Sequence, residues 1–148
     1  HYSVVYNDVG GNGHKYNNAG NSPTNTPGAF MGGFSAGDIL TFALDCDNNT
    51  LKIGANGQWA NGSGSTNQTF ANTTAITIAD PTLVPSGYYF PACGDYTGTS
   101  NTIEFNFGNG FFGNTAITSA GTNASNLGLF EYDVPADYKA ICSKGLNT

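Results

Sequence analysis

The sequence predicts an all-β protein, an antiparallel β-sandwich built from two sheets. Helical periodicity is nearly absent, short stretches of alternating polar and apolar residues recur, and clusters of Gly, Asn, Ser and Thr separate them. The chain of 148 residues has the length of one domain, and its 39% hydrophobic content is enough for a core. About seven or eight short strands joined by turns are typical of such a sandwich.

Each expected element follows from its local pattern. Alternation or apolar clustering predicts strands at residues 2–7, 38–46, 51–55, 74–79, 88–93, 101–107 and 127–132. Turn residues predict turns at 47–50 and at Asn56-Gly57, the strongest hairpin signal in the chain. Loops are expected at 10–28, 58–68 and 109–126, and one helical turn at 135–138. The side chains expected in the core are Phe42, Leu44, Ile53, Phe90, Ile103, Phe105 and Phe107.

Charge and cysteine content exclude several classes of protein. A net charge of −6 without any arginine argues against nucleic-acid binding, and no apolar run is long enough to span a bilayer. Cys46, Cys93 and Cys142 are odd in number and far apart, unlike a disulfide framework. They also lack Cys-x-x-Cys spacing and neighbouring histidines, so we expect free thiols and neither a metal nor any other cofactor.

Two short motifs have alternative interpretations. Residues 45–50 fit a hairpin turn capped by Asx side chains or part of a calcium loop, but Thr50 and Asn56 stand where an EF-hand needs Gly and Glu. The glycines of FGNGFFG (107–113) match the dinucleotide fingerprint formally, yet no helix pattern follows to hold a pyrophosphate. We therefore expect turns at both places.

The titratable residues predict no catalytic site. Glycoside hydrolysis needs two suitably separated carboxylates, and a nucleophile needs an adjacent base. Glu104 lies on the polar face of a predicted strand, Glu131 is the only other glutamate, and His14 lies in a glycine-rich loop. We therefore expect that the protein is not an enzyme.

Aromatic residues outside the predicted strand interiors are the candidate ligand-binding residues. Trp59, Tyr16 and Tyr96 lie in polar stretches, where rings can stack on sugars or enter a pocket of a partner protein. The alternative is that these rings fold back and cover one end of the sandwich. Trp59 is the leading candidate because Gly, Asn, Gln and Ser surround it.

Three ordered sequence blocks resemble the SPRY domain family. GDILTFALDCDNNTLKIGANG (37–57) resembles the family's central motif, in which Gly-Asp opens a strand and an Asn-Gly turn follows a Thr-Leu strand. GYYFPACGDY (87–96) and NTIEFNFG (101–108) are similar to its later strands, and HYSVVYNDVGGNGHKYNN (1–18) is similar to an earlier strand and hairpin. The tail VPADYKAICSKGLNT (134–148) resembles sequence that follows SPRY modules in phage structural proteins.

The resemblance implies one concanavalin-like, jelly-roll sandwich domain over 1–148, with 109–148 as a loop-rich extension. Because the family's first strands have no counterpart here, we expect a section of a longer chain; a strand supplied by another chain is the alternative. The implied function is a non-catalytic binding or structural module of a phage tail fibre or virion surface protein, located in the virion or outside the cell.

The expected partners are proteins, a host receptor or glycan, or further copies in a homo-oligomer, without nucleic acid or membrane insertion. Two other functions stay open. One is a lectin-like carbohydrate-binding module, in which Trp59 would contact the sugar. The other is a glycan-cleaving sandwich enzyme, which would require Glu104 and an aspartate to face each other across a groove.

Overall fold

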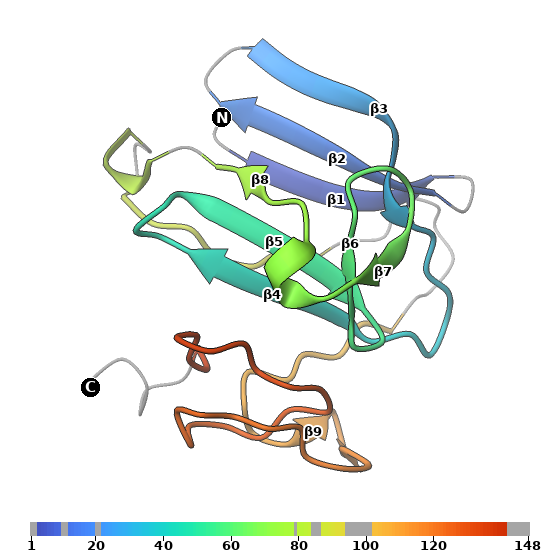
Figure 1. Ribbon diagram of the computed structural model, residues 1–148, viewed down its shortest axis with the longest axis vertical. Coiled ribbons are helices and arrows are strands. Elements are labelled where there is room, and N and C mark those ends of the chain that lie inside the picture. Colours follow the sequence, from blue (N-terminus) through green and yellow to red (C-terminus); the bar gives the residue numbers. More distant parts are fainter. Residues whose placement is uncertain are drawn as a thin grey trace. The chain divides into compact units, whose positions relative to one another are not determined.

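The computed structural model describes residues 3–9, 12–19, 22–78, 80–83, 87–93 and 102–141, with side chains from Phe30 onward apart from Pro81. The chain divides into two compact units, His1–Tyr89 (unit 1) and Phe90–Thr148 (unit 2). Regular structure in the described residues consists of antiparallel sheets and two 3-10 helices of three residues (Figure 1). The all-β prediction is therefore confirmed, and a single domain over 1–148 stays a prediction.

Unit 1 begins with a three-stranded antiparallel sheet. Its strands β1 (Ser3–Val9), β2 (Asn12–Ala19) and β3 (Ser22–Gly32) lie in the order β1-β2-β3. The strand predicted at 2–7 is confirmed, but the loop predicted at 10–28 is wrong, because most of it forms β2 and β3. Asn, Gly and Pro are poor strand formers, yet β2 has ladder partners on both sides, and such context outweighs intrinsic propensity.

A five-stranded sheet follows in unit 1. Strands β4 (Leu40–Asp45), β5 (Thr50–Ala55), β6 (Gln58–Ala60) and β7 (Thr66–Gln68) lie in that order, and β8 (Ile76–Thr77) also pairs with β5. The strands predicted at 38–46, 51–55 and 74–79 are confirmed in their central residues. The loop predicted at 58–68 is confirmed only for residues 61–65, because the hairpin turn before it carries pairing onward into β6 and then β7.

Two turns set the register of β4, β5 and β6. In the first, Asp45 Oδ1 accepts hydrogen bonds from the N–H groups of Asp47 (3.0 Å) and Asn48 (2.9 Å). In the second, Asn56 (φ 51°) and Gly57 (φ 79°) have the left-handed backbone of a two-residue type I′ turn. Both predicted turns are confirmed, and the Asp45 oxygens serve as turn caps.

The core of unit 1 contains one face of the five-stranded sheet. Ile53, Ile76 and Met31 are fully buried, and they pack with Phe30, Ala55, Ala60 and Ile78. Leu40, Leu44, Leu51 and Tyr89 pack against this cluster. Of the core residues predicted in unit 1, Ile53 is confirmed and Leu44 is half-buried, but Phe42 is wrong because its side chain is 56% exposed. Phe42 lies opposite Ile53 on the edge strand β4, where fewer neighbours cover a side chain.

The segment that links the two units forms no strand in its described part. The 3-10 helices η1 (Phe70–Asn72) and η2 (Pro81–Leu83) precede it, and residues 87–93 lie in no ladder. The strand predicted at 88–93 is therefore wrong, and Phe90, predicted in the core, is 78% exposed. Pro91 has no N–H to donate, and no described strand offers this segment a partner.

Unit 2 has little regular structure among its described residues. Its hairpin consists of β9 (Phe111–Phe112) and β10 (Thr115–Ala116), and isolated bridges join Asn109 to Leu129 and Asn123 to Val134. The strands predicted at 101–107 and 127–132 are wrong over their described residues, and 135–138 forms a turn instead of a helical turn. The predicted core residues Ile103, Phe105 and Phe107 are also wrong, because all three are exposed.

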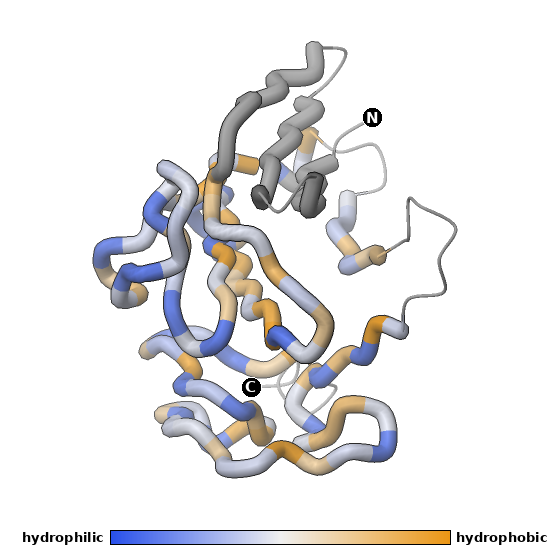
Figure 2. The backbone as a smooth tube through the Cα atoms, turned by 90° about the vertical axis from the view of Figure 1, so that its right-hand side faces the viewer, coloured by the Kyte–Doolittle hydropathy of each residue, from blue (hydrophilic) through white to orange (hydrophobic). Residues whose placement is uncertain are grey.

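Hydrogen bonds, more than a hydrophobic core, hold unit 2 together. Ala140 is the only buried hydrophobic side chain among its described residues. Figure 2 shows hydrophobic and hydrophilic residues interspersed along this part of the tube. Side chains instead bond the backbone, as where Asn123 Nδ2 donates to the carbonyl groups of Leu127 (2.6 Å) and Gly128 (3.1 Å). Such bonds fasten loops without requiring regular strands.

Candidate functional site

Trp59 lies in β6, paired with Gly54 on the face of the sheet opposite the Ile53 core. Its side chain is 6% exposed and meets the Phe70 ring edge to face, with 4.9 Å between ring centroids. Lys52 Nζ lies 4.0 Å from the centroid of the Phe70 ring and donates to the Phe70 carbonyl (3.3 Å). Trp59 therefore belongs to a packed cover of this face, and little of its ring is left for a ligand.

The other two predicted ligand-binding residues lie where the side chains are not described. Tyr16 is in β2, between Val5 of β1 and Asn25 of β3, and only its backbone is described. Tyr96 lies outside the described residues. Trp59 is the only one of the three whose ring the structure describes, and the ligand-binding role of all three stays a prediction.

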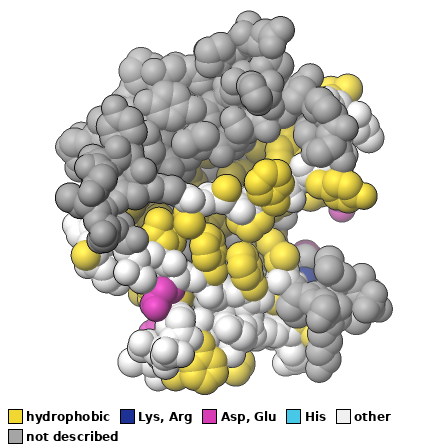
Figure 3. All heavy atoms as spheres, turned by 180° about the vertical axis from the view of Figure 1, so that it is seen from behind, with side chains coloured by type: hydrophobic (Ala, Val, Ile, Leu, Met, Phe, Trp, Pro, Cys, Tyr) yellow, Lys and Arg dark blue, Asp and Glu magenta, His cyan; other side chains and the backbone are white. Residues whose placement is uncertain are grey.

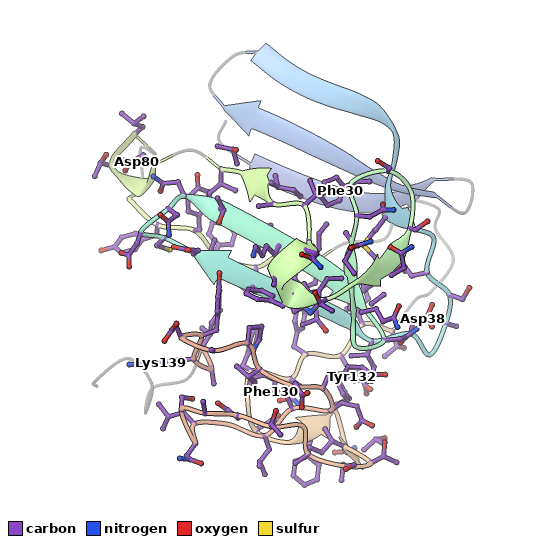
Figure 4. The ribbon with its side chains drawn as sticks, in the orientation of Figure 1. Phe30, Asp38, Asp80, Phe130, Tyr132 and Lys139 are labelled. Atoms are coloured by element: carbon purple, nitrogen blue, oxygen red, sulfur yellow. The ribbon has the colours of Figure 1, made fainter. Side chains whose placement is uncertain are left out.

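Asp38 fastens the chain before β4 to the turn between β5 and β6 (Figure 4). Its Oδ2 accepts a hydrogen bond from the Ser35 N–H (2.7 Å), and its Oδ1 accepts one from Asn56 Nδ2 (2.8 Å). Asn56 Oδ1 in turn accepts from the Ile39 N–H (3.0 Å). The bond from Asn56, and secondarily that from Ser35, lowers the pKa of Asp38.

Two carboxylates of unit 2 also accept hydrogen bonds from threonines of the same unit. Glu131 accepts hydrogen bonds from the hydroxyl and the N–H of Thr118, the latter at 2.7 Å, and these bonds lower its pKa. Asp133 accepts from the Thr122 N–H (2.6 Å), which lowers its pKa. The exposed Glu104 lies with its carboxylate against Gly113, whose missing side chain leaves the room. Within the described residues, no three His, Cys, Asp or Glu side chains are placed to hold a metal ion.

Hydrogen bonds of Asn106 fix the C-terminal end of the segment 102–107 where the turn begins. Asn106 Oδ1 accepts from the Gly108 N–H (2.7 Å), and Asn106 Nδ2 donates to the Leu129 carbonyl (3.0 Å). Gly108 (φ 105°) and Gly128 (φ 84°) pack so closely that a Cβ on either would lie 2.9 Å from the Cβ of Ala140. The turn predicted at residues 107–113 is confirmed, since no helix follows it within residues 102–141.

Three exposed side chains of unit 2, Ile103, Phe105 and Phe107, form what we call the apolar strip. They are 50%, 44% and 40% exposed, and the Phe105 and Phe107 rings stack with centroids 5.4 Å apart and planes 11° apart. Large hydrophobic side chains are open to solvent on the face shown in Figure 3. The alternation that predicts a buried strand is present in the strip, but sequence alone does not reveal whether anything covers it.

A small cavity also lies in unit 2. Its volume is about 210 Å³, and it is lined by Ala124, Ser125, Asp137, Tyr138 and Lys139. Ligand sites for drug-sized molecules usually enclose about 300–1,000 Å³. The apolar strip is therefore the stronger candidate.

Comparisons with known proteins do not identify the chain. No family model matches it, and neither does any curated protein or solved structure. The resemblance to the SPRY family accordingly stays a prediction. No helix in the described part of the chain has the length and apolar character needed to cross a membrane.

Proposed function

We propose that this protein is a non-catalytic binding or structural module whose apolar strip joins it to a neighbouring subunit. The observation that carries the proposal is the exposed stack of Phe105 and Phe107 beside Ile103. Exposed apolar side chains that gather in one place commonly mark protein interaction sites. Burying these three side chains against a partner would remove an otherwise unfavourable surface from water.

A protein strand suits the apolar strip better than a glycan does. Residues 102–107 lie in no described ladder, so their N–H and C=O groups can pair with an added strand. A sugar would need polar side chains beside the rings to bind its hydroxyl groups. Asn106, the polar residue between the two phenylalanines, already uses both ends of its amide within unit 2.

A second copy of this chain fits the apolar strip. When two 102–107 segments pair antiparallel about a two-fold axis at Phe105, each Phe105 lies opposite its own copy. Ile103 then lies opposite the partner subunit's Phe107, so both apolar faces match. Glu104 lies opposite the partner subunit's Asn106, and no two carboxylates meet.

This assembly role suits a subunit of a phage tail fibre or virion surface. That part of the proposal depends on the sequence resemblance of 1–18, 37–57, 87–96, 101–108 and 134–148 to the SPRY family and to phage structural proteins. The same resemblance supports a two-sheet sandwich of the SPRY type. In it, residues 102–107 would become a strand of the second sheet once they are paired.

Disulfide trapping tests the proposed pairing. In a background with Cys46, Cys93 and Cys142 replaced by serine, Phe105→Cys should give a disulfide-linked dimer on mild oxidation. Directly opposed strand residues have Cα atoms about 4.5–5.5 Å apart, which a disulfide spans. Phe111→Cys is the matched control, because Phe111 is 45% exposed in the same unit but lies outside the strip. Equal cross-linking of both variants, or none of Phe105→Cys, would overturn the proposal.

A further inference from the structure

Among the residues whose side chains are described, three Asn-Gly pairs occur: Asn56-Gly57, Asn61-Gly62 and Asn109-Gly110. In such a pair the glycine nitrogen can attack the side-chain carbonyl carbon of asparagine, because glycine has no Cβ in the way. Three atoms govern the reaction: the attacking nitrogen, the carbonyl oxygen that gains charge, and the amide nitrogen that leaves. The hydrogen bonds made by these atoms differ among the three pairs.

At Asn61 the side-chain oxygen is bound by backbone donors, and both reacting nitrogens are left without a hydrogen bond in the described part of the chain. Its Oδ1 accepts hydrogen bonds from the N–H groups of Ser63 (2.7 Å) and Ser65 (3.1 Å). Backbone donors aimed at an oxygen that gains negative charge stabilise the transition state, as in an oxyanion hole. Within the described part of the chain, neither Asn61 Nδ2 nor the Gly62 N–H makes a hydrogen bond.

In the other two pairs the side-chain oxygen also accepts a backbone hydrogen bond, from Ile39 at Asn56 (3.0 Å) and from Phe111 at Asn109 (3.2 Å), but one of the two reacting nitrogens is engaged as well. Asn56 Nδ2, the leaving nitrogen, donates to the carboxylate of Asp38 (2.8 Å), and bonds to charged groups are the stronger ones. In the third pair the attacking nitrogen is engaged, because the Gly110 N–H donates to Asn106 Oδ1 (3.4 Å). Both arrangements should slow the reaction.

We propose that Asn61 is a self-modification site, at which the folded protein converts asparagine into aspartate and isoaspartate. The Gly62 nitrogen bonds to Asn61 Cγ, the Cγ–Nδ2 bond breaks, and ammonia leaves with the proton that the Gly62 nitrogen gives up through solvent. Water then opens the cyclic imide at one of its two C–N bonds. Opening at the side-chain carbonyl gives aspartate, and opening at the main-chain carbonyl gives isoaspartate.

The modification would act on the connection between β6 and β7. There the Asn61 N–H donates to the Ser65 carbonyl (2.9 Å), and the Thr74 hydroxyl donates to the Asn61 carbonyl (2.7 Å). Isoaspartate adds a methylene to the main chain at this point and shifts the two groups that make these bonds. The edge of the five-stranded sheet should therefore loosen as the protein ages.

Peptide mapping by mass spectrometry tests the proposal on the full chain, incubated at mildly alkaline pH. In the folded protein we expect Asn61 to react at least about tenfold faster than Asn56, roughly the effect of one hydrogen bond to a charged group. In urea the pairs should react at similar rates. If Asn61 is no faster than Asn56 when folded, or keeps its lead in urea, the proposal is wrong.

Asp38→Ala provides the matched control. Without the carboxylate, Asn56 Nδ2 is released, so Asn56 should react faster while the rate at Asn61 stays the same. An unchanged rate at Asn56 would show that its hydrogen bond to Asp38 does not slow the reaction. The explanation of the different rates at Asn61 and Asn56 would then be wrong. Should this variant not fold, the comparison of the folded and urea-treated wild-type chain still decides the proposal.

Discussion

At the residue scale, acidic side chains stabilise turns by accepting hydrogen bonds from nearby residues. Asp38 accepts from Ser35 and Asn56, Asp45 caps its own turn, and Asp80 accepts hydrogen bonds from both the N–H (2.8 Å) and the hydroxyl (2.7 Å) of Thr82. Each of these hydrogen bonds favours the charged carboxylate and lowers its pKa. These bonds are exposed, so each adds to the precision of a turn more than to overall stability.

Asp38 offers a direct test of this interpretation. A carboxyl whose pKa is lower in the folded state stabilises the fold above its ordinary pKa, and that contribution is lost as the pH falls through the folded value. An NMR titration of the Asp38 carboxyl carbon should therefore give a midpoint below the ordinary one. Asn56→Ala should move this midpoint upward, because Asn56 is the largest cause of the shift; an unmoved midpoint would contradict the assignment.

Phe42 and Ile53 form a matched pair for a stability measurement, because they lie opposite each other on β4 and β5. Ile53 is 1% exposed, so Ile53→Ala should cost about 2–5 kcal/mol of unfolding free energy. Phe42→Ala should cost about 1 kcal/mol or less, since the ring is mostly exposed. Urea denaturation of both variants checks the order, and a larger loss for Phe42→Ala would mean that something covers this ring in solution.

At the element scale, glycine positions decide how closely segments of unit 2 approach. Gly128→Ala would place a Cβ 2.9 Å from both the Cβ of Ala140 and the Cα of Gly108, at a backbone φ of 84°. Gly37→Ala is the matched control, because its φ is 91° but nothing lies within 4 Å of the added Cβ. Both variants carry a left-handed strain of roughly 1–2 kcal/mol, and only Gly128→Ala adds an overlap. Urea denaturation should therefore show the larger loss for Gly128→Ala; equal losses would contradict this packing.

At the scale of the whole molecule, the two units differ in what stabilises them. Unit 1 has a buried core, whereas Ala140 is the only buried hydrophobic side chain in the described part of unit 2. Amide hydrogen exchange should detect this difference. The Ile78 N–H, bonded to the Asn49 carbonyl, should open at a higher free energy than the Gly121 N–H, bonded to the Phe130 carbonyl. Equal protection of the two amides would show that unit 2 has a stabilising contribution that the described contacts lack.

Association is the second property at this scale. If the apolar strip joins two copies, sedimentation velocity should show a dimer whose population rises with concentration. The double variant Phe105→Ser/Phe107→Ser should shift this equilibrium to the monomer, because it removes the stacked rings and leaves the backbone unchanged. Phe42→Ser, which removes an exposed ring from unit 1, should leave association unchanged. If Phe42→Ser also abolished the dimer, association would depend on exposed hydrophobic side chains in general and not on the apolar strip.

The local features of this protein follow from short stretches of its sequence. The Asn56-Gly57 turn, the turn capped by Asp45 and the strands around Ile53 and Ile76 could all be predicted, because they depend on backbone φ, short-range hydrogen bonds and alternation. The all-β class follows from the same short-range rules. They apply wherever those residues occur, whatever lies next to them in space.

The pairing of the predicted strands and the covering of apolar faces depend on contacts in the folded chain. Strands β2 and β3 formed because neighbouring segments of the chain supplied ladder partners. Trp59 was covered by Phe70, which lies outside the β5–β6 hairpin that positions Trp59. Phe105 and Phe107 carry the same alternating signal as Ile53, yet they stay exposed. Alternation along a strand determines which side chains share a face, but burial of that face depends on what packs against it.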